Sequence, residues 1–163
     1  MSATPHFISD LHLGHKKILQ FSNQWRGGTT IQEHDDWIVT QWNKTIGKRD
    51  PVYVLGDVAF TREGLQRVKE LNGQKFLIMG NHDFAQIHEY EDVGFRILGG
   101  IVKYKGFWLS HAPIHPNELR GCANIHGHVH SESIDDSRYI NVCVEPLGGV
   151  PLSIHEISRR NLV

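Results

Sequence analysis

The chain has 163 residues, 39% of them hydrophobic, and its 17 basic and 18 acidic residues give a formal net charge of −1. This length predicts one domain, residues 1–163, with a sizeable hydrophobic core. The near-neutral charge provides no general attraction to nucleic acid or to an anionic membrane.

Histidine is the unusual residue type, with 12 copies. Imidazole is a common metal ligand, so the excess is informative where histidines cluster. The two cysteines, Cys122 and Cys143, form no Cys-x-x-Cys pair and are expected in the core of a protein from a reducing compartment. The sequence also lacks an apolar run of the roughly 20 residues that span a membrane, and it lacks a signal peptide pattern. We therefore expect a cytoplasmic protein.

The first elements place an aspartate and a histidine directly after an apolar strand. His6–Ser9 predicts this strand, and a helical stretch begins after Gly14. Asp10 and His12 lie between the two elements, and on extended backbone a spacing of two residues points both side chains the same way. Loops at the carboxyl ends of strands are where open α/β sheets bind ligands.

A helix and a second strand follow. Thr30 and Glu33 form a capping box, which predicts the start of a helix that ends near Gly47. Pro51–Leu55 is rich in β-branched and aromatic residues and predicts a strand. This strand also stops at a carboxylate, Asp57.

The same order repeats once more. Thr61 predicts the start of a helix that ends at Gly73. Phe76–Met79 then predicts a buried strand that runs into the polar residues 80–83, and a short helical or irregular stretch covers Ala85–Tyr90.

The second half predicts mainly strands. Phe107–Leu109 and Ala123–Ile125 each lead into histidines, and Tyr139–Val144 and Pro151–Ile157 are expected as closing strands joined by a glycine turn. Five strand ends thus carry metal-binding residue types, and in a shared sheet they would meet at one edge. These residues are Asp10 and His12, Asp57, Asn81 with His82, His111, and His128 with His130.

The ordered blocks are Asp-x-His, Gly-Asp, Gly-Asn-His-Asp, His and Gly-His-x-His, from residue 10 to residue 130. Each block alone is a weak signal, but the ordered set covers most of the chain. With these motifs the sequence resembles the calcineurin-like metallophosphoesterase superfamily, and its opening Asp-x-His-x-Gly-His resembles the small, insert-free bacterial and phage members. The resemblance implies an α/β fold, the four-layer α/β/β/α metallophosphoesterase sandwich.

The resemblance also implies two metal sites bridged by Asp57. The implied ligands are Asp10, His12, Asp57 and His130 for one ion, and Asp57, Asn81, His111 and His128 for the other. Because imidazole ligands are numerous, we expect two divalent transition-metal ions per chain, with manganese first and iron, nickel, cobalt or zinc as alternatives. The two divalent ions would carry four positive charges, and only the carboxylates of Asp10 and Asp57 oppose them. A net positive charge therefore remains in the pocket, which suits a phosphate.

Five further residues have expected roles near this site. His82 is not needed as a ligand when Asn81 is one, and we expect it to protonate the leaving group as a general acid. Asp83 either orients that imidazole or is a turn residue. His15, His115 and Arg120 are candidates for a contact to phosphate or to a metal ligand, and for each of them an ordinary surface or packing role is at least as well supported.

One departure from the superfamily narrows the activity. The protein-phosphatase branch reads Gly-Asp-x-Val-Asp-Arg-Gly, whereas residues 56–62 read Gly-Asp-Val-Ala-Phe-Thr-Arg. Since the second aspartate and the arginine of that branch are missing, dephosphorylation of proteins is not expected.

The expected function is a binuclear phosphoesterase acting on a small phosphate ester, nucleotide-derived esters included. Diesters are favoured over monoesters because no inserted cap closes over the site. A nuclease is one alternative, although the basic clusters at 16–17, 48–49 and 159–160 are short. A non-catalytic binding scaffold is another, and the complete ligand set argues against it.

Overall fold

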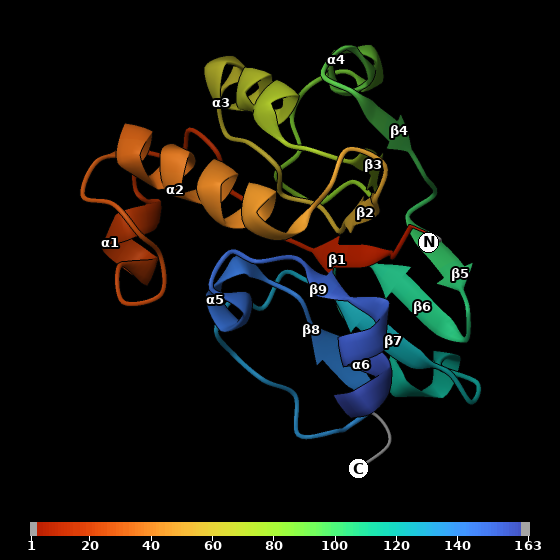
Figure 1. Cartoon of the computed structure of the whole chain (residues 1–163). Helices are drawn as coiled ribbons and strands as arrows, with labels where there is room; N and C mark the ends of the chain where they lie inside the picture. Colours follow the sequence, from red (N-terminus) through yellow and green to blue (C-terminus); the bar gives the residue numbers. More distant parts are fainter. Residues whose placement is uncertain (1–2, 161–163) are drawn as a thin grey trace.

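The computed structural model describes residues 3–160 and contains two β-sheets with helices around them (Figure 1). The strands are β1 (His6–Ile8), β2 (Pro51–Val54), β3 (Gln74–Leu77), β4 (Phe95–Ile97), β5 (Ile101–Tyr104), β6 (Phe107–Ser110), β7 (Ala123–His126), β8 (Tyr139–Asn141) and β9 (Leu152–Ser153). The α-helices are α1 (Ile18–Ser22), α2 (Ile31–Thr45), α3 (Arg62–Gln66), α4 (Ile87–Asp92), α5 (Val144–Leu147) and α6 (Ile154–Arg160). Two 3₁₀ turns, η1 (Arg67–Glu70) and η2 (Pro116–Glu118), complete the list.

The first sheet has the order β4-β3-β2-β1-β9. Strands β1 to β4 are parallel, and β9 pairs antiparallel with β1. Because side chains alternate along a strand, one face presents residues such as Ile8 and Val54, which pack with Trp42 of α2 and Leu65 of α3. Helices α2, α3 and α4 therefore cover this face, as the upper part of Figure 1 shows.

The second sheet has the order β5-β6-β7-β8, with β6, β7 and β8 parallel. Phe7 on the other face of the first sheet packs in one buried cluster with Leu109 and Ile125 of the second sheet. Ile154 and Ile157 of α6 belong to the same cluster. The predicted sandwich of two sheets flanked by helices is confirmed.

Two local predictions near the C-terminal end are wrong. Tyr139–Val144 is a strand only as far as Asn141, and helix α5 begins at Val144. Pro151–Ile157 contains only the two residues of β9 before α6 begins. The helix start has a local cause, because Glu156 accepts hydrogen bonds from the backbone and hydroxyl of Ser153 at 2.9 and 2.6 Å. This pairing is the capping pattern that the sequence predicts at Thr30, where the structure confirms it.

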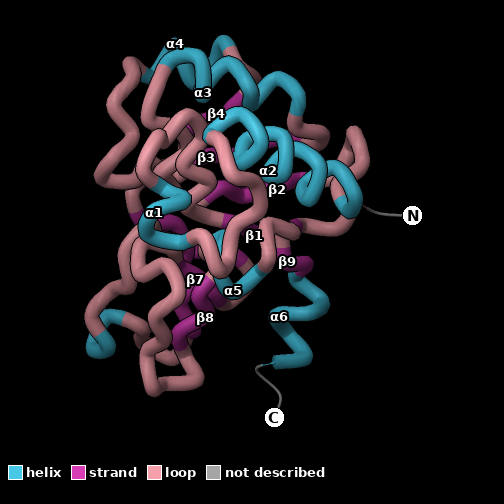
Figure 2. The backbone as a smooth tube through the Cα atoms, turned by 90° about the vertical axis from the view of Figure 1, so that its left-hand side faces the viewer, coloured by secondary structure: helices cyan, strands magenta, loops and turns pink. Residues whose placement is uncertain are grey.

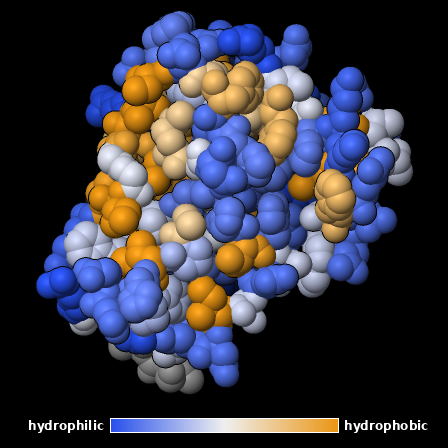
Figure 3. All heavy atoms as spheres, turned by 180° about the vertical axis from the view of Figure 1, so that it is seen from behind, coloured by the Kyte–Doolittle hydropathy of each residue, from blue (hydrophilic) through white to orange (hydrophobic). Residues whose placement is uncertain are grey.

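The parallel strands finish at one end of the molecule. Viewed from that side, Figure 2 shows loops around α1 and α5, with α2, α3 and α4 above them. On the face drawn in Figure 3, hydrophobic residues lie in separate groups among hydrophilic ones. Within residues 3–160, none of the helices has both the length and the hydropathy needed to cross a membrane.

Candidate metal centre

Five of the predicted site residues have left-handed backbone conformations. The φ angles are +61° at Asp10, +54° at His12, +55° at Asp57, +72° at His128 and +51° at His130. Non-glycine residues rarely adopt this region, and such strain concentrates at functional sites. The aspartate and histidine of the first motif thus lie in a tight loop after β1, where the strand geometry that the sequence analysis used does not apply.

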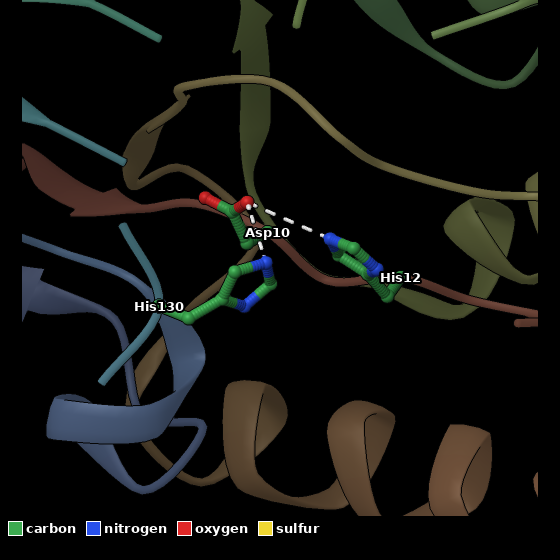
Figure 4. A group of neighbouring side chains, drawn as sticks. All are labelled: Asp10, His12 and His130. Carbon is green, nitrogen blue, oxygen red and sulfur yellow. Dashed lines mark ion pairs between the residues drawn. The ribbon is translucent and has the colours of Figure 1, made fainter. Parts of the chain in front are cut away.

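The first group of side chains consists of Asp10, His12 and His130 (Figure 4). His12 Nε2 lies 3.5 Å from Asp10 Oδ1, and His130 Nε2 lies 3.9 Å from the same oxygen. Asp57 Oδ2 is 3.7 Å from His12 Nε2. These atoms come from three loops and face a common point.

The second group of donor atoms lies on the side of Oδ1, the other carboxylate oxygen of Asp57. Asp57 Oδ1 is 3.5 Å from His111 Nε2, which in turn lies 2.8 Å from Asn81 Oδ1. His128 Nδ1 is 3.0 Å from that amide oxygen and 3.1 Å from His111 Nε2. The two oxygens of Asp57 therefore face different groups of donor atoms.

Two buried atoms of the first group lack a hydrogen-bond partner among the described residues. They are Asp10 Oδ1 and His12 Nε2. Burial of such atoms without a partner is costly, and a carboxylate oxygen beside an imidazole nitrogen is a donor set for a divalent cation. The residues present therefore fit a metal ion.

The remaining contacts of Asp10 direct its free oxygen toward this point. Its Oδ2 accepts hydrogen bonds from the Ser9 hydroxyl at 2.6 Å, the His128 backbone N–H at 2.9 Å and the Cys143 thiol at 3.3 Å. Burial alone would raise the pKa of Asp10, but His12, the Ser9 hydroxyl and the His128 backbone N–H hold it well below its usual range. Burial also lowers the pKa of His12, which favours the neutral imidazole that binds metals.

The glycines of the motifs allow the strand-end loops to approach closely. A Cβ atom at Gly127 would overlap Ser9 Oγ and Asp10 Oδ2. A Cβ atom at Gly80 would overlap Asp57 Oδ1. These two positions need glycine because of this close approach, which is a general use of the residue.

A buried ion pair, which none of the sequence motifs indicates, supports the first group. Glu145 of α5 accepts hydrogen bonds from Arg26 Nε at 2.8 Å and from His130 Nδ1 at 3.1 Å. Arg26 also donates to the backbone oxygens of Asp10 and Leu11 at 2.7 and 3.0 Å. The contact to Glu145 uses Nδ1 of His130 and leaves Nε2 facing Asp10, an arrangement that fixes the ligating nitrogen in many metal sites.

His82 and Asp83 have different surroundings. His82 is exposed, its backbone N–H donates to Asp57 Oδ1 at 2.9 Å, and its ring lies 5.0 Å from that of Phe60. The Asp83 carboxylate accepts backbone N–H groups from Gly80, Asp57 and Val58 at 2.7–2.9 Å. It joins two loops and, among the described residues, makes no hydrogen bond to the His82 ring.

His15, His115 and Arg120, whose roles the sequence leaves open, lie in two different places. His15 stacks on Phe60 with ring centroids 4.0 Å apart, and its Nδ1 lies 3.2 Å from His12 Nδ1. Burial, followed by positively charged neighbours, lowers the pKa of His15 to about 4. His115 and Arg120 line a different hollow of about 580 Å³, which none of the seven predicted metal ligands lines.

Hollows open on both sides of the two groups. One, of about 400 Å³, is lined by His12, His130 and His82 together with Phe21 and Phe60. The other, also of about 400 Å³, is lined by Asn81, His111 and His128 together with apolar residues that include Ile101 and Ile114. A ligand bound between the groups can therefore extend in two directions.

Comparison with known proteins identifies the family. The sequence profile of the calcineurin-like phosphoesterases matches residues 6–147. The solved structure of AQ665 from Aquifex aeolicus, a protein of unknown function, is 29% identical and has a TM-score of 0.76 over 99% of this chain and 100% of that chain. The nuclease MPE of Pseudomonas putida is 19% identical and has a TM-score of 0.56 over 77% of this chain and 61% of that chain. A novel archaeal phosphodiesterase is 18% identical and has a TM-score of 0.51 over 85% of this chain and 82% of that chain. Both structures show likeness of fold. Since the profile extends from β1 to α5 and spans every strand-end block of the site, the chain belongs to the calcineurin-like phosphoesterase family.

Proposed function

We propose that this chain hydrolyses phosphodiesters at a centre of two divalent metal ions. The observation that carries the proposal is the position of Asp57, whose two carboxylate oxygens face different histidines, Oδ2 toward His12 and Oδ1 toward His111. The buried, unpaired Asp10 Oδ1 and His12 Nε2 support it, because they are the atoms that a cation would satisfy.

The proposed ligands follow from this arrangement. One ion is held by Asp10, His12, Asp57 and His130, and the other by Asp57, Asn81, His111 and His128. Imidazole-rich sites suit manganese, iron, cobalt, nickel or zinc better than calcium. When bound, such ions polarise the phosphate and supply a water of lowered pKa.

The chain's own residues handle the leaving group. Water releases a proton to the solvent as its oxygen forms a bond to phosphorus, the bond from phosphorus to the leaving oxygen breaks, and the leaving oxygen takes a proton. His82 is the proposed proton donor, because its exposed ring makes no hydrogen bond to the described residues and lines the hollow beside His12 and His130. Asp83 holds the backbone of Asp57 and Gly80 in place and thus acts as a positioning residue.

The preference for diesters rests on the two hollows. A monoester carries one organic group, whereas a diester carries two, and each hollow can take one of them. The names of two proteins with a similar fold, a nuclease and a phosphodiesterase, agree with diester chemistry. We propose a small phosphodiester as the substrate.

The test reconstitutes metal-free protein with single metals and measures hydrolysis of a monoester, a diester and a single-stranded oligonucleotide. The proposal expects metal-dependent turnover of the diester at a higher kcat/KM than that of the monoester. Preferred cleavage of the oligonucleotide would favour the nuclease alternative. Absence of turnover with every metal, despite bound ions, would overturn the proposal in favour of a binding scaffold.

A further inference from the structure

The hollow beside His82 has an aromatic wall. The ring of His15 lies on that of Phe60 with an interplanar angle of 15°, and the Phe60 ring lies 5.0 Å from that of His82. Phe21 of α1 also lines this hollow, and 71% of its surface is exposed. Phe21 and Phe60 together give this hollow aromatic surface beside His12 and His130, which a ligand bound there can cover.

The lining of this hollow carries no acidic, lysine or arginine side chain among the described residues. The phosphate belongs between the metal groups, where the proposed ions supply positive charge. An additional anionic group in the hollow would find no lysine or arginine to pair with, since the histidines there are His12 and His130, which we propose as metal ligands, His15, and His82, which we propose to protonate the leaving oxygen. An uncharged, planar group fits the aromatic wall, because stacking on such side chains is favourable for any ring.

The two hollows differ in their position relative to the proposed proton donor. His82 lines the hollow with Phe21 and Phe60, whereas the hollow with Ile101 and Ile114 is lined by no residue that we assign to proton transfer. The group that departs must therefore occupy the hollow with Phe21.

From these contacts we infer that the hollow with Phe21 binds an uncharged planar aromatic group carried by the leaving oxygen of the phosphodiester. A nucleoside is the biological class with this chemistry, since its base is planar and uncharged. The inference rests on the proposed function and deepens it by naming the substrate class.

The test measures equilibrium binding of two phosphonates that cannot be hydrolysed, phenylphosphonate and methylphosphonate, to the metal-reconstituted protein by calorimetry. We expect the wild type to bind the phenyl compound roughly tenfold more tightly, as stacking on an aromatic side chain provides. Phe21→Ala should remove most of this preference and leave the affinity for methylphosphonate nearly unchanged. Trp25→Ala is the matched control, since Trp25 is 43% exposed in the segment after α1 but does not line the hollow.

Each other outcome overturns the inference. If Phe21→Ala keeps the phenyl preference while Ile101→Ala loses it, the ring occupies the opposite hollow. If Phe21→Ala weakens both phosphonates equally, the residue supports the metal centre and not the ring. If the wild type binds the two phosphonates equally, the inference alone fails, and if it binds neither with its metals present, the proposed function fails as well.

Discussion

Arg26 and Glu145 form a fully buried ion pair, with Arg26 Nε donating to Glu145 Oε1 at 2.8 Å and both side chains inaccessible to solvent. The pair joins the loop after α1 to helix α5, residues that are 119 positions apart in the sequence. Since Arg26 also binds the backbone of Asp10 and Glu145 binds His130, the pair connects two loops of the candidate metal centre.

Removal of the arginine should destabilise the protein strongly. Arg26→Met leaves the Glu145 carboxylate buried without its partner, which should lower the free energy of unfolding by about 3–5 kcal/mol. Denaturant unfolding measures this change. Arg138→Met is the control, because Arg138 pairs with Asp136 at the surface and should have little effect. A result in which both variants behave alike would contradict the role of the buried pair.

The pH dependence of stability should report the same carboxylate. Burial alone would raise the pKa of Glu145, but His130 and Arg26 lower it from 4.5 to about 2. Because the folded pKa lies below the unfolded one, the ionised group contributes stability above pH 4.5, and this contribution is lost as the pH falls toward 2. Unfolding of the metal-free protein at a series of pH values should therefore show a flatter acid dependence for Glu145→Gln than for the wild type. Equal slopes would exclude this linkage.

Asp83 should matter for stability more than for proton transfer. Its carboxylate accepts the backbone N–H groups of Gly80, Asp57 and Val58. Asp83→Ala leaves these donors unsatisfied, and at about 1–3 kcal/mol for each buried group the loss in free energy of unfolding should be large. Thermal unfolding of the metal-free variant measures it. Unchanged stability together with a shifted pH-rate profile would support the alternative in which Asp83 orients His82.

The role of His82 separates metal binding from acid catalysis. His82→Ala should bind metals nearly as the wild type does, because we propose Asn81 and not His82 as a ligand. A leaving alkoxide of high pKa needs the proton, whereas a nitrophenolate departs with little help, so kcat should fall by about 10²–10⁴ for the former and little for the latter. An equal loss on both diesters would assign His82 to phosphate orientation.

The strand-end residues could be predicted because their signal is local. Asp10, Asp57 and His111 each follow a short apolar run, and the parallel order of the strands brings such positions together. Glu145 has the same kind of signal, since it follows the predicted strand Tyr139–Val144, but it belongs to none of the recognised motifs. That position could have been found.

Arg26 and Phe21 could not be predicted in the same way. Arg26 lies in a short segment of polar residues and glycines, and its burial depends on contact with α5 far along the chain. Phe21 belongs to an apolar helical pattern, which predicts a core position. The short helix α1 instead buries Ile18 and Ser22 and leaves Phe21 exposed.

Elemental analysis of the wild type and of Asp57→Asn tests the central claim, the shared metal centre, most directly. Asp57 is the one residue proposed to bind both ions, and asparagine keeps its shape and its hydrogen bond from the His82 backbone. After reconstitution and removal of free metal, the wild type should hold two ions per chain. The folded variant should have a markedly lower occupancy at both sites. An unchanged stoichiometry in Asp57→Asn, or a single ion in the wild type, would contradict the bridging role of Asp57.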